Sequence, residues 1–210
     1  MFILLLTIPQ GSLFASDFSI NFGINHSWLI NPDVPKSWDN EFNPGFSICV
    51  NLSQILVNDI DFSYGIRLFS VGNYSEDKLS NLETYGTTTK SKINYIYISS
   101  PFQLDYELFQ NVAPFLNIEP SFLVKSEMSI KNDFVDNKSD ISKDMESLNL
   151  FIGIGLKYIF DFNNHKFALV GMYNYGLLRI TKNKGLKENQ IGTWTDLRVR
   201  EFLLTIGYYF

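Results

Sequence analysis

Hydrophobic and polar residues alternate with a period of two over most of the chain. Over residues 200–210, one face is apolar and the other is mixed. The apolar face comprises Phe202, Leu204, Ile206, Tyr208 and Phe210. This period is typical of β-strands whose two faces meet different surroundings. Seven further stretches alternate in the same way: 17–29, 45–53, 60–69, 93–108, 114–125, 148–160 and 167–179. The pattern predicts an all-β chain of eight strands, with a bulge or bend at Ser99-Ser100-Pro101.

The segments between these strands alternate in length. Long polar segments cover 30–43, 70–92, 126–147 and 180–194, and short ones cover 54–59, 109–113 and 161–166. Small outer-membrane barrels have short periplasmic turns and long outer loops, with both termini on the turn side. Most of the strands also reach the roughly 9–11 residues that a tilted bilayer-spanning strand needs. We therefore predict an eight-stranded antiparallel up-and-down transmembrane β-barrel in the bacterial outer membrane, with both termini in the periplasm.

The less apolar face of the strands carries isolated charges among Gly, Ser and Asn residues. These charges are Asp61, Arg67, Glu119, Lys157 and Glu201. The interior of an eight-stranded barrel is just wide enough for side chains to fill it, and buried charges are normally paired. We expect these five residues to form an ion-pair network in the lumen. Two alternatives stay open: a narrow, porin-like channel lined by the same charges, and a soluble lipocalin-like ligand-binding barrel with its apolar faces turned inward.

The N-terminal segment predicts export. Residues 2–8 are apolar and lead to a stretch with small residues that ends at Ser16, as in a secretory signal peptide. The apolar run is far shorter than the about 20 residues that cross a bilayer as a helix. No Lys or Arg precedes it, so we expect the signal to be shortened at its start. We predict a signal peptide at 1–16 and a barrel domain at 17–210.

Composition narrows the function classes. The 17 Lys and Arg residues against 22 Asp and Glu residues give a net charge of -5, which argues against a nucleic-acid partner. The aromatic content of 16% suits the interfacial girdles of a membrane barrel. Cys49 is the single cysteine and His26 and His165 are the only histidines, so we expect neither a metal site nor a cofactor.

Catalysis is not expected either. A triad-like site needs a histidine beside a nucleophile. His26 and Ser27 are adjacent, so they point to opposite faces of a strand, and His165 falls in a short turn with no Ser or Cys beside it. We therefore expect a structural, adhesion or surface-binding role, with an extracellular ligand bound through the long loops at 30–43, 70–92, 126–147 and 180–194.

Three stretches resemble the PorT-like outer-membrane β-barrel family: IYISSPFQLDYEL at 96–108, YNYGLLRI at 173–180 and REFLLTIGYYF at 200–210. The resemblance implies a small barrel of the outer membrane and no particular activity. The closing stretch, which ends on Phe210, also resembles the C-terminal insertion signal of bacterial outer-membrane barrels. It implies outer-membrane lipids and the outer-membrane assembly machinery as partners.

Overall fold

The computed structural model describes residues 16–30, 44–57, 59–78, 88–109, 111–131, 136–181 and 198–210. The strands are β1 (Ser16–Ile30), β2 (Pro44–Val57), β3 (Ile60–Lys78), β4 (Thr88–Ser99), β5 (Phe102–Tyr106), β6 (Val112–Lys131), β7 (Asp136–Asp140), β8 (Leu148–Phe162), β9 (His165–Gly176) and β10 (Arg198–Tyr209). One short 3-10 helix, η1 (Ser142–Asp144), follows β7. Within these ranges, no helix is long and apolar enough to cross a membrane. The signal peptide predicted at 1–16 lies outside them, except for Ser16.

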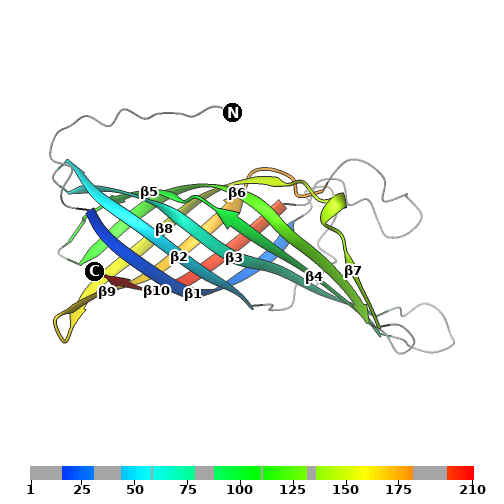
Figure 1. Cartoon of the computed structure of the whole chain (residues 1–210). Helices are drawn as coiled ribbons and strands as arrows, with labels where there is room; N and C mark the ends of the chain where they lie inside the picture. Colours follow the sequence, from blue (N-terminus) through cyan, green and yellow to red (C-terminus); the bar gives the residue numbers. More distant parts are fainter. Residues whose placement is uncertain are drawn as a thin grey trace.

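The sheet closes on itself because the first and last strands pair. β1 is antiparallel to β2 on one side and to β10 on the other, and every other wall strand is also antiparallel to its neighbours (Figure 1). β4 and β5 follow one another along a single wall position, since both pair with β3 and with β6. The barrel wall therefore has eight strands, and the predicted fold class is confirmed.

The bulge or bend predicted at 99–101 is an interruption between β4 and β5 without a shift of register. β3 keeps one register across the interruption between β4 and β5, with Arg67 opposite Ser99 and Tyr64 opposite Phe102. The irregularity is instead in β6, where the register with β4 shifts between Leu123 and Lys125. Pro101 still interrupts the ladder, because proline has no backbone N–H to donate.

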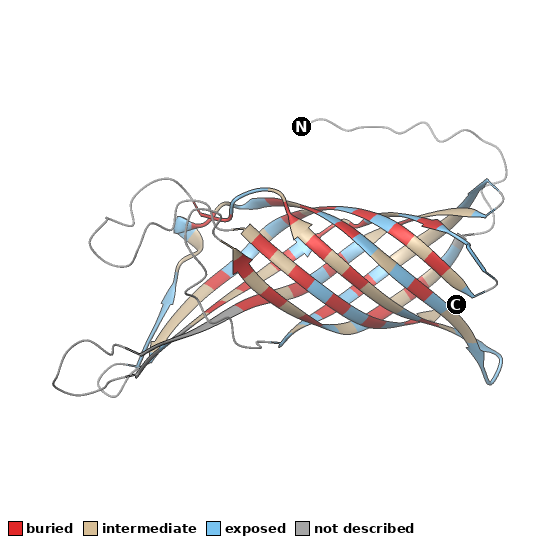
Figure 2. Cartoon of the chain, turned by 180° about the vertical axis from the view of Figure 1, so that it is seen from behind, coloured by how far each residue is buried: buried red, intermediate tan, exposed pale blue. Residues whose placement is uncertain are grey.

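Buried and more exposed residues alternate along the strands, as the banding in Figure 2 shows, so the two faces of each strand point in opposite directions. The apolar face points outward: Ile66 is 66% exposed, Ile154 62% and Leu116 59%. The polar face points into the barrel, where Ser121, Asn174 and Glu201 are fully buried. An apolar belt around a polar interior suits a lipid environment and argues against the soluble lipocalin-like alternative.

The predicted loops at 70–92 and 126–147 are partly strand. β3 continues to Lys78 and pairs with β4 from Thr88, while β6 continues to Lys131 and pairs with β7. The sequences of these extensions are mostly polar, although Met128 of β6 packs against buried apolar residues, so the alternation of apolar residues that marked the other strands is weak. The fourth predicted loop, 180–194, also has different bounds, because β9 ends at Gly176 and β10 begins at Arg198.

The two ends of the barrel differ. The turn end, as we call it, holds both ends of the described chain and the short connections (Figure 1). One of these is a two-residue hairpin of Asn163 and Asn164, with φ of 50° and 62°, which matches the twist of the flanking strands. The opposite end, called the loop end, carries the β3–β4 and β6–β7 extensions.

Candidate functional site: the barrel interior

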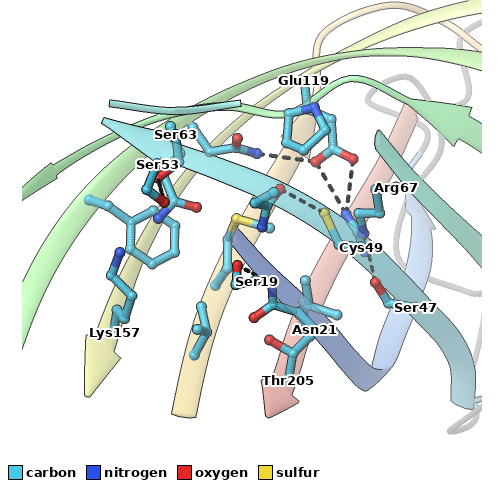
Figure 3. Close-up of a pocket in the computed structure, with 18 of the residues that line it drawn as sticks. Ser19, Asn21, Ser47, Cys49, Ser53, Ser63, Arg67, Glu119, Lys157 and Thr205 are labelled. Atoms are coloured by element: carbon cyan, nitrogen blue, oxygen red, sulfur yellow. Dashed lines mark hydrogen bonds and ion pairs between the residues drawn. The ribbon is translucent and has the colours of Figure 1, made fainter. Parts of the chain in front are cut away.

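A buried arginine lies between two carboxylates at mid-height in the barrel. Arg67 of β3 places Nη1 3.2 Å from Glu119 Oε2 and Nη2 2.6 Å from Glu201 Oε1. Glu119 comes from β6 and Glu201 from β10, and all three side chains are at most 2% exposed. Figure 3 shows the guanidinium pointing toward Glu119 across the interior. We call these three residues the central ion cluster.

Neutral side chains satisfy the remaining positions of the central ion cluster. Glu119 accepts hydrogen bonds from Ser99 Oγ and Asn117 Nδ2, and Glu201 accepts them from Asn25 Nδ2 and Asn174 Nδ2. The Nε–H of Arg67 donates to Ser47 Oγ at 2.8 Å. These bonds connect seven of the eight wall strands, all except β8. Paired buried networks rigidify the structure around them. In this one the charged groups are paired, while the Oδ1 atoms of Asn25, Asn117 and Asn174 have no partner among the described residues.

A second ion pair lies closer to the turn end. Lys157 Nζ of β8 is 3.0 Å from Asp105 Oδ2 of β5, and both side chains are at most 6% exposed. Asp105 also accepts hydrogen bonds from Ser63 Oγ and Gln103 Nε2. Asp61 is half-buried and lies opposite Asp105 in the β3–β5 register.

The five charges predicted for the lumen therefore do not form one group. The structure brings Arg67, Glu119 and Glu201 together, whereas Lys157 pairs with Asp105. Asp61 lines a mouth of about 390 Å³ at the turn end. Sequence reasoning missed Asp105, although the same signal was present: a charge between the outward residues Leu104 and Tyr106. Within the described ranges, no group of three or more His, Cys, Asp or Glu residues could hold a metal ion.

Apolar side chains fill the loop end of the interior. This loop-end plug comprises Leu29, Phe69, Val71, Ile93, Tyr95, Tyr97, Met145, Phe151, Ile180 and Val199, each at most 5% exposed. Phe69 stacks on Tyr97 with ring centroids 5.5 Å apart, and the Arg67 guanidinium lies 4.0 Å from the Phe69 centroid. The segment around Met145 crosses this end, where it bridges to Thr181. The plug therefore covers the central ion cluster on the loop side.

Below the central ion cluster, the interior holds little free space. A cavity of about 50 Å³ lies among residues that include Asn21, Cys49, Asn117 and Phe115. This volume is enough for a few water molecules. A smaller apolar cluster of Phe115, Met172 and Leu203 packs in the same part of the barrel.

Asparagine side chains inside the barrel pack on glycines of the neighbouring strand. Asn21 lies opposite Gly207, Asn25 opposite Gly45, and Asn51 opposite Gly65. A Cβ atom on any of these glycines would collide with the side-chain oxygen of its asparagine. The glycines thus make room for the hydrogen-bonding residues of a narrow interior.

Above the plug, the β6–β7 extension carries a small surface ion network. Glu127 of β6 is 2.9 Å from Lys125 and 3.0 Å from Lys138 of β7. The hydrogen bond from Lys125, followed by the one from Lys138, lowers the pKa of Glu127 below its usual value. A carboxyl whose pKa is lowered by folding stabilises the folded form at higher pH, and this contribution is lost as pH falls through the lowered pKa.

We therefore expect the β6–β7 pairing to loosen in acid. Hydrogen-exchange protection of the amides in β7 should fall between neutral pH and about pH 3, the range in which carboxylates titrate. The Glu127→Gln variant should show a smaller change over the same range, because it has no carboxylate at this position. An unchanged pH dependence in that variant would contradict the assignment to Glu127.

The closed wall, the outward apolar belt and the filled polar interior define a membrane-spanning β-barrel protein. The sequence matches the family Outer membrane protein beta-barrel domain over residues 13–182, and the chain belongs to that family. It is therefore an integral protein of the bacterial outer membrane. The turn end faces the periplasm and the loop end faces the outside of the cell.

Several solved structures have a similar fold. Neisserial surface protein A shares 16% identity and a TM-score of 0.47, covering 93% of this chain and 99% of that one. Ail, the attachment invasion locus protein of Yersinia pestis, in complex with the heparin analogue sucrose octasulfate, shares 14% identity and a TM-score of 0.43, with coverage of 93% and 99%. The outer membrane protease OmpT of Escherichia coli shares 11% identity and a TM-score of 0.44, with coverage of 93% and 96%. None of the curated proteins compared with the chain matches it.

Proposed function

We propose that this protein is a non-conducting barrel that binds a partner outside the cell through its loop end. The observation that carries the proposal is the loop-end plug, which fills the interior between the central ion cluster and the cell exterior. A solute on its way through the barrel would have to displace both the aromatic side chains of the plug and the ion cluster beneath them. The narrow-pore alternative is favoured by the cavity of about 50 Å³ and the mouth of about 390 Å³, both on the turn side of the plug.

The proposal predicts an electrically silent barrel. Full-length protein inserted into a planar bilayer should show no sustained single-channel steps, because the apolar plug excludes hydrated ions. A large-bore porin inserted under the same conditions serves as the positive control. Sustained, reproducible steps from the wild-type chain would contradict the proposal and favour the pore.

The binding half of the proposal is tested by shortening connections while leaving the strands intact. Deleting all of 70–92 would remove Val71, which belongs to the plug, so the deletion should be confined to 79–87 between β3 and β4. A second variant shortens 132–135 between β6 and β7. Cells that display either variant should adhere less to a monolayer of cultured cells than cells that display the wild type. Unchanged adhesion after both deletions would count against a binding role for these connections.

Three finer assignments belong to the same proposal. The stretches at 96–108, 173–180 and 200–210 support membership of the PorT-like family. The outward apolar face of β10, with Phe202, Leu204, Ile206 and Tyr208, and Phe210 directly after the strand support the role of this stretch as the insertion signal read by the assembly machinery. A non-enzymatic role is supported by Ser27, whose hydroxyl is buried and bonded to the backbone of Gly72, on the face opposite to His26.

A further inference from the structure

On the outer face of β1, β10 and β9, apolar side chains give way to arginines and aromatic rings toward the loop end. In the β-sheet register, Arg200 of β10 lies between Trp28 of β1 and Tyr175 of β9. One row further toward the loop end, Arg198 lies opposite Ile30. All five residues alternate with inward-facing neighbours, so their side chains lie on the membrane side of the wall. Two arginines and two aromatic rings thus mark the edge of the apolar belt in the leaflet that faces the cell exterior.

Arg200 is arranged to bind an anion. Its guanidinium carbon lies 5.2 Å from the centroid of the Tyr175 ring. Its Nε–H is enclosed by protein and has no hydrogen-bond partner among the described residues, so contact with a phosphate would fall to the terminal Nη donors. Arginine binds phosphate through several parallel N–H donors in a rigid fork, and at a membrane edge its apolar stem lies along lipid while its charge reaches the headgroups.

An apolar groove begins directly beneath this arginine row. It has a volume of about 680 Å³, and its lining is almost entirely apolar. One row of outward side chains along it is Phe202, Tyr173, Ile154 and Leu116, and the next is Gly171, Leu156 and Pro114. Gly171 leaves a notch in the wall, because a Cβ added there would meet nothing within 4 Å.

The spacing of the two features matches a membrane lipid. Gly171 and Tyr175 are four residues apart on β9, which is roughly 13 Å along a strand. A strand tilt of about 40° reduces this to roughly 10 Å of depth, within the ~15 Å thickness of one hydrocarbon leaflet. A phosphate at Arg200 would therefore leave the acyl chains of the same molecule at the level of the groove.

We propose that Arg198, Arg200 and the groove at Gly171 form a binding site for a phosphorylated lipid of the leaflet that faces the cell exterior. The phosphate binds the Arg200 guanidinium between Trp28 and Tyr175, with Arg198 one row closer to the loop end, and one acyl chain occupies the notch at Gly171. The charged edge and the apolar groove lie on the same outer wall, so one lipid molecule can contact both. The site does not depend on the adhesion role proposed above.

Lipid binding to the full chain in neutral detergent micelles tests this site, with bound molecules counted by native mass spectrometry. The probe is phosphatidic acid, and diacylglycerol with the same chains and inorganic phosphate are the comparators. The wild type should bind phosphatidic acid at least about tenfold more tightly than either comparator. Of the three molecules, only phosphatidic acid has both a phosphate group and acyl chains. Equal binding of inorganic phosphate would show a site for a free anion and overturn the lipid assignment.

Variants test the two halves of the site separately. Arg200→Gln should weaken phosphatidic acid binding about tenfold, and the double variant R198Q/R200Q should remove the preference over diacylglycerol. Gly171→Leu should also weaken binding, because the new side chain fills the notch. Lys125→Gln on the outer face of β6 is the matched control, since it removes one exposed charge near the loop end away from the site. Heat-dependent gel mobility confirms that each variant is folded.

The proposal is overturned if R198Q/R200Q binds phosphatidic acid as the wild type does. It is also overturned if Lys125→Gln weakens binding as much as Arg200→Gln, because the effect would then be general charge attraction. Unchanged binding in Gly171→Leu would remove the groove from the site.

Discussion

Replacing Arg67 with methionine is expected to destabilise the barrel by about 3–5 kcal/mol, the usual cost of removing one partner from a buried ion pair. Glu119 and Glu201 would keep their neutral donors but lose Arg67, the cation that contacts both of them. Two buried carboxylates would then face each other across a space closed to bulk water. The free energy of unfolding should be measured by urea titration in detergent micelles, with the heat-dependent gel shift as the readout.

A compensating variant separates charge from packing. The triple variant Arg67→Met, Glu119→Gln and Glu201→Gln should recover most of the lost stability, because no uncompensated charge remains in the interior. Lys125→Met, which removes an exposed cation from β6, should change stability by less than about 1 kcal/mol. If Arg67→Met also costs less than this, the central ion cluster does not stabilise the barrel.

The second large effect on stability is expected from Gly23→Ala, which adds a single methyl group. A Cβ atom there would lie 2.8 Å from the Cα of Thr205 and would collide with the carbonyl oxygen of Leu204. Both are backbone atoms of β10, so a side-chain rotation cannot relieve the contact. Gly23→Ala should therefore lower the free energy of unfolding by about 1–3 kcal/mol or more, as overpacking does.

Gly171→Ala is the matched control for Gly23→Ala. It makes the same chemical change in a strand on the other side of β10, but its new methyl group enters open space. We expect it to be neutral or to stabilise the barrel slightly, because alanine restricts the unfolded chain more than glycine does. Equal losses in the two variants would mean that backbone propensity, rather than the contact with β10, sets the cost.

The alternation of residues was sufficient to predict the wall of the barrel. Phe202, Leu204 and Ile206 point outward and Glu201 points inward, as the period of two requires. Loop lengths predicted the two ends for a similar reason, because only one end of a small membrane barrel carries long connections. These features depend on local sequence, so a single chain is enough to reveal them.

The contents of the lumen depend on register and could not be predicted to the same degree. The shift of each strand against its neighbours decides which charges meet. The observed register separates Lys157 from Glu119 and brings Lys157 to Asp105. Asn25 and Asn174 carry no charge, so nothing in the sequence marked them as partners of Glu201. The polar extensions of β3, β4 and β6 fall within predicted loops because their sequences show little apolar alternation.

The order in which the central ion cluster can form follows from where its members lie in the chain. Asn25 and Glu201 are 176 residues apart and belong to the two strands that meet last along the chain, β1 and β10. Until β10 is in place, Arg67 can pair with Glu119 but lacks its second carboxylate, that of Glu201. Completion of the seam and completion of the cluster are therefore a single event. A chain that stops before Glu201 would remain an open sheet with a half-neutralised arginine, a state that differs in charge as well as in shape from the finished protein.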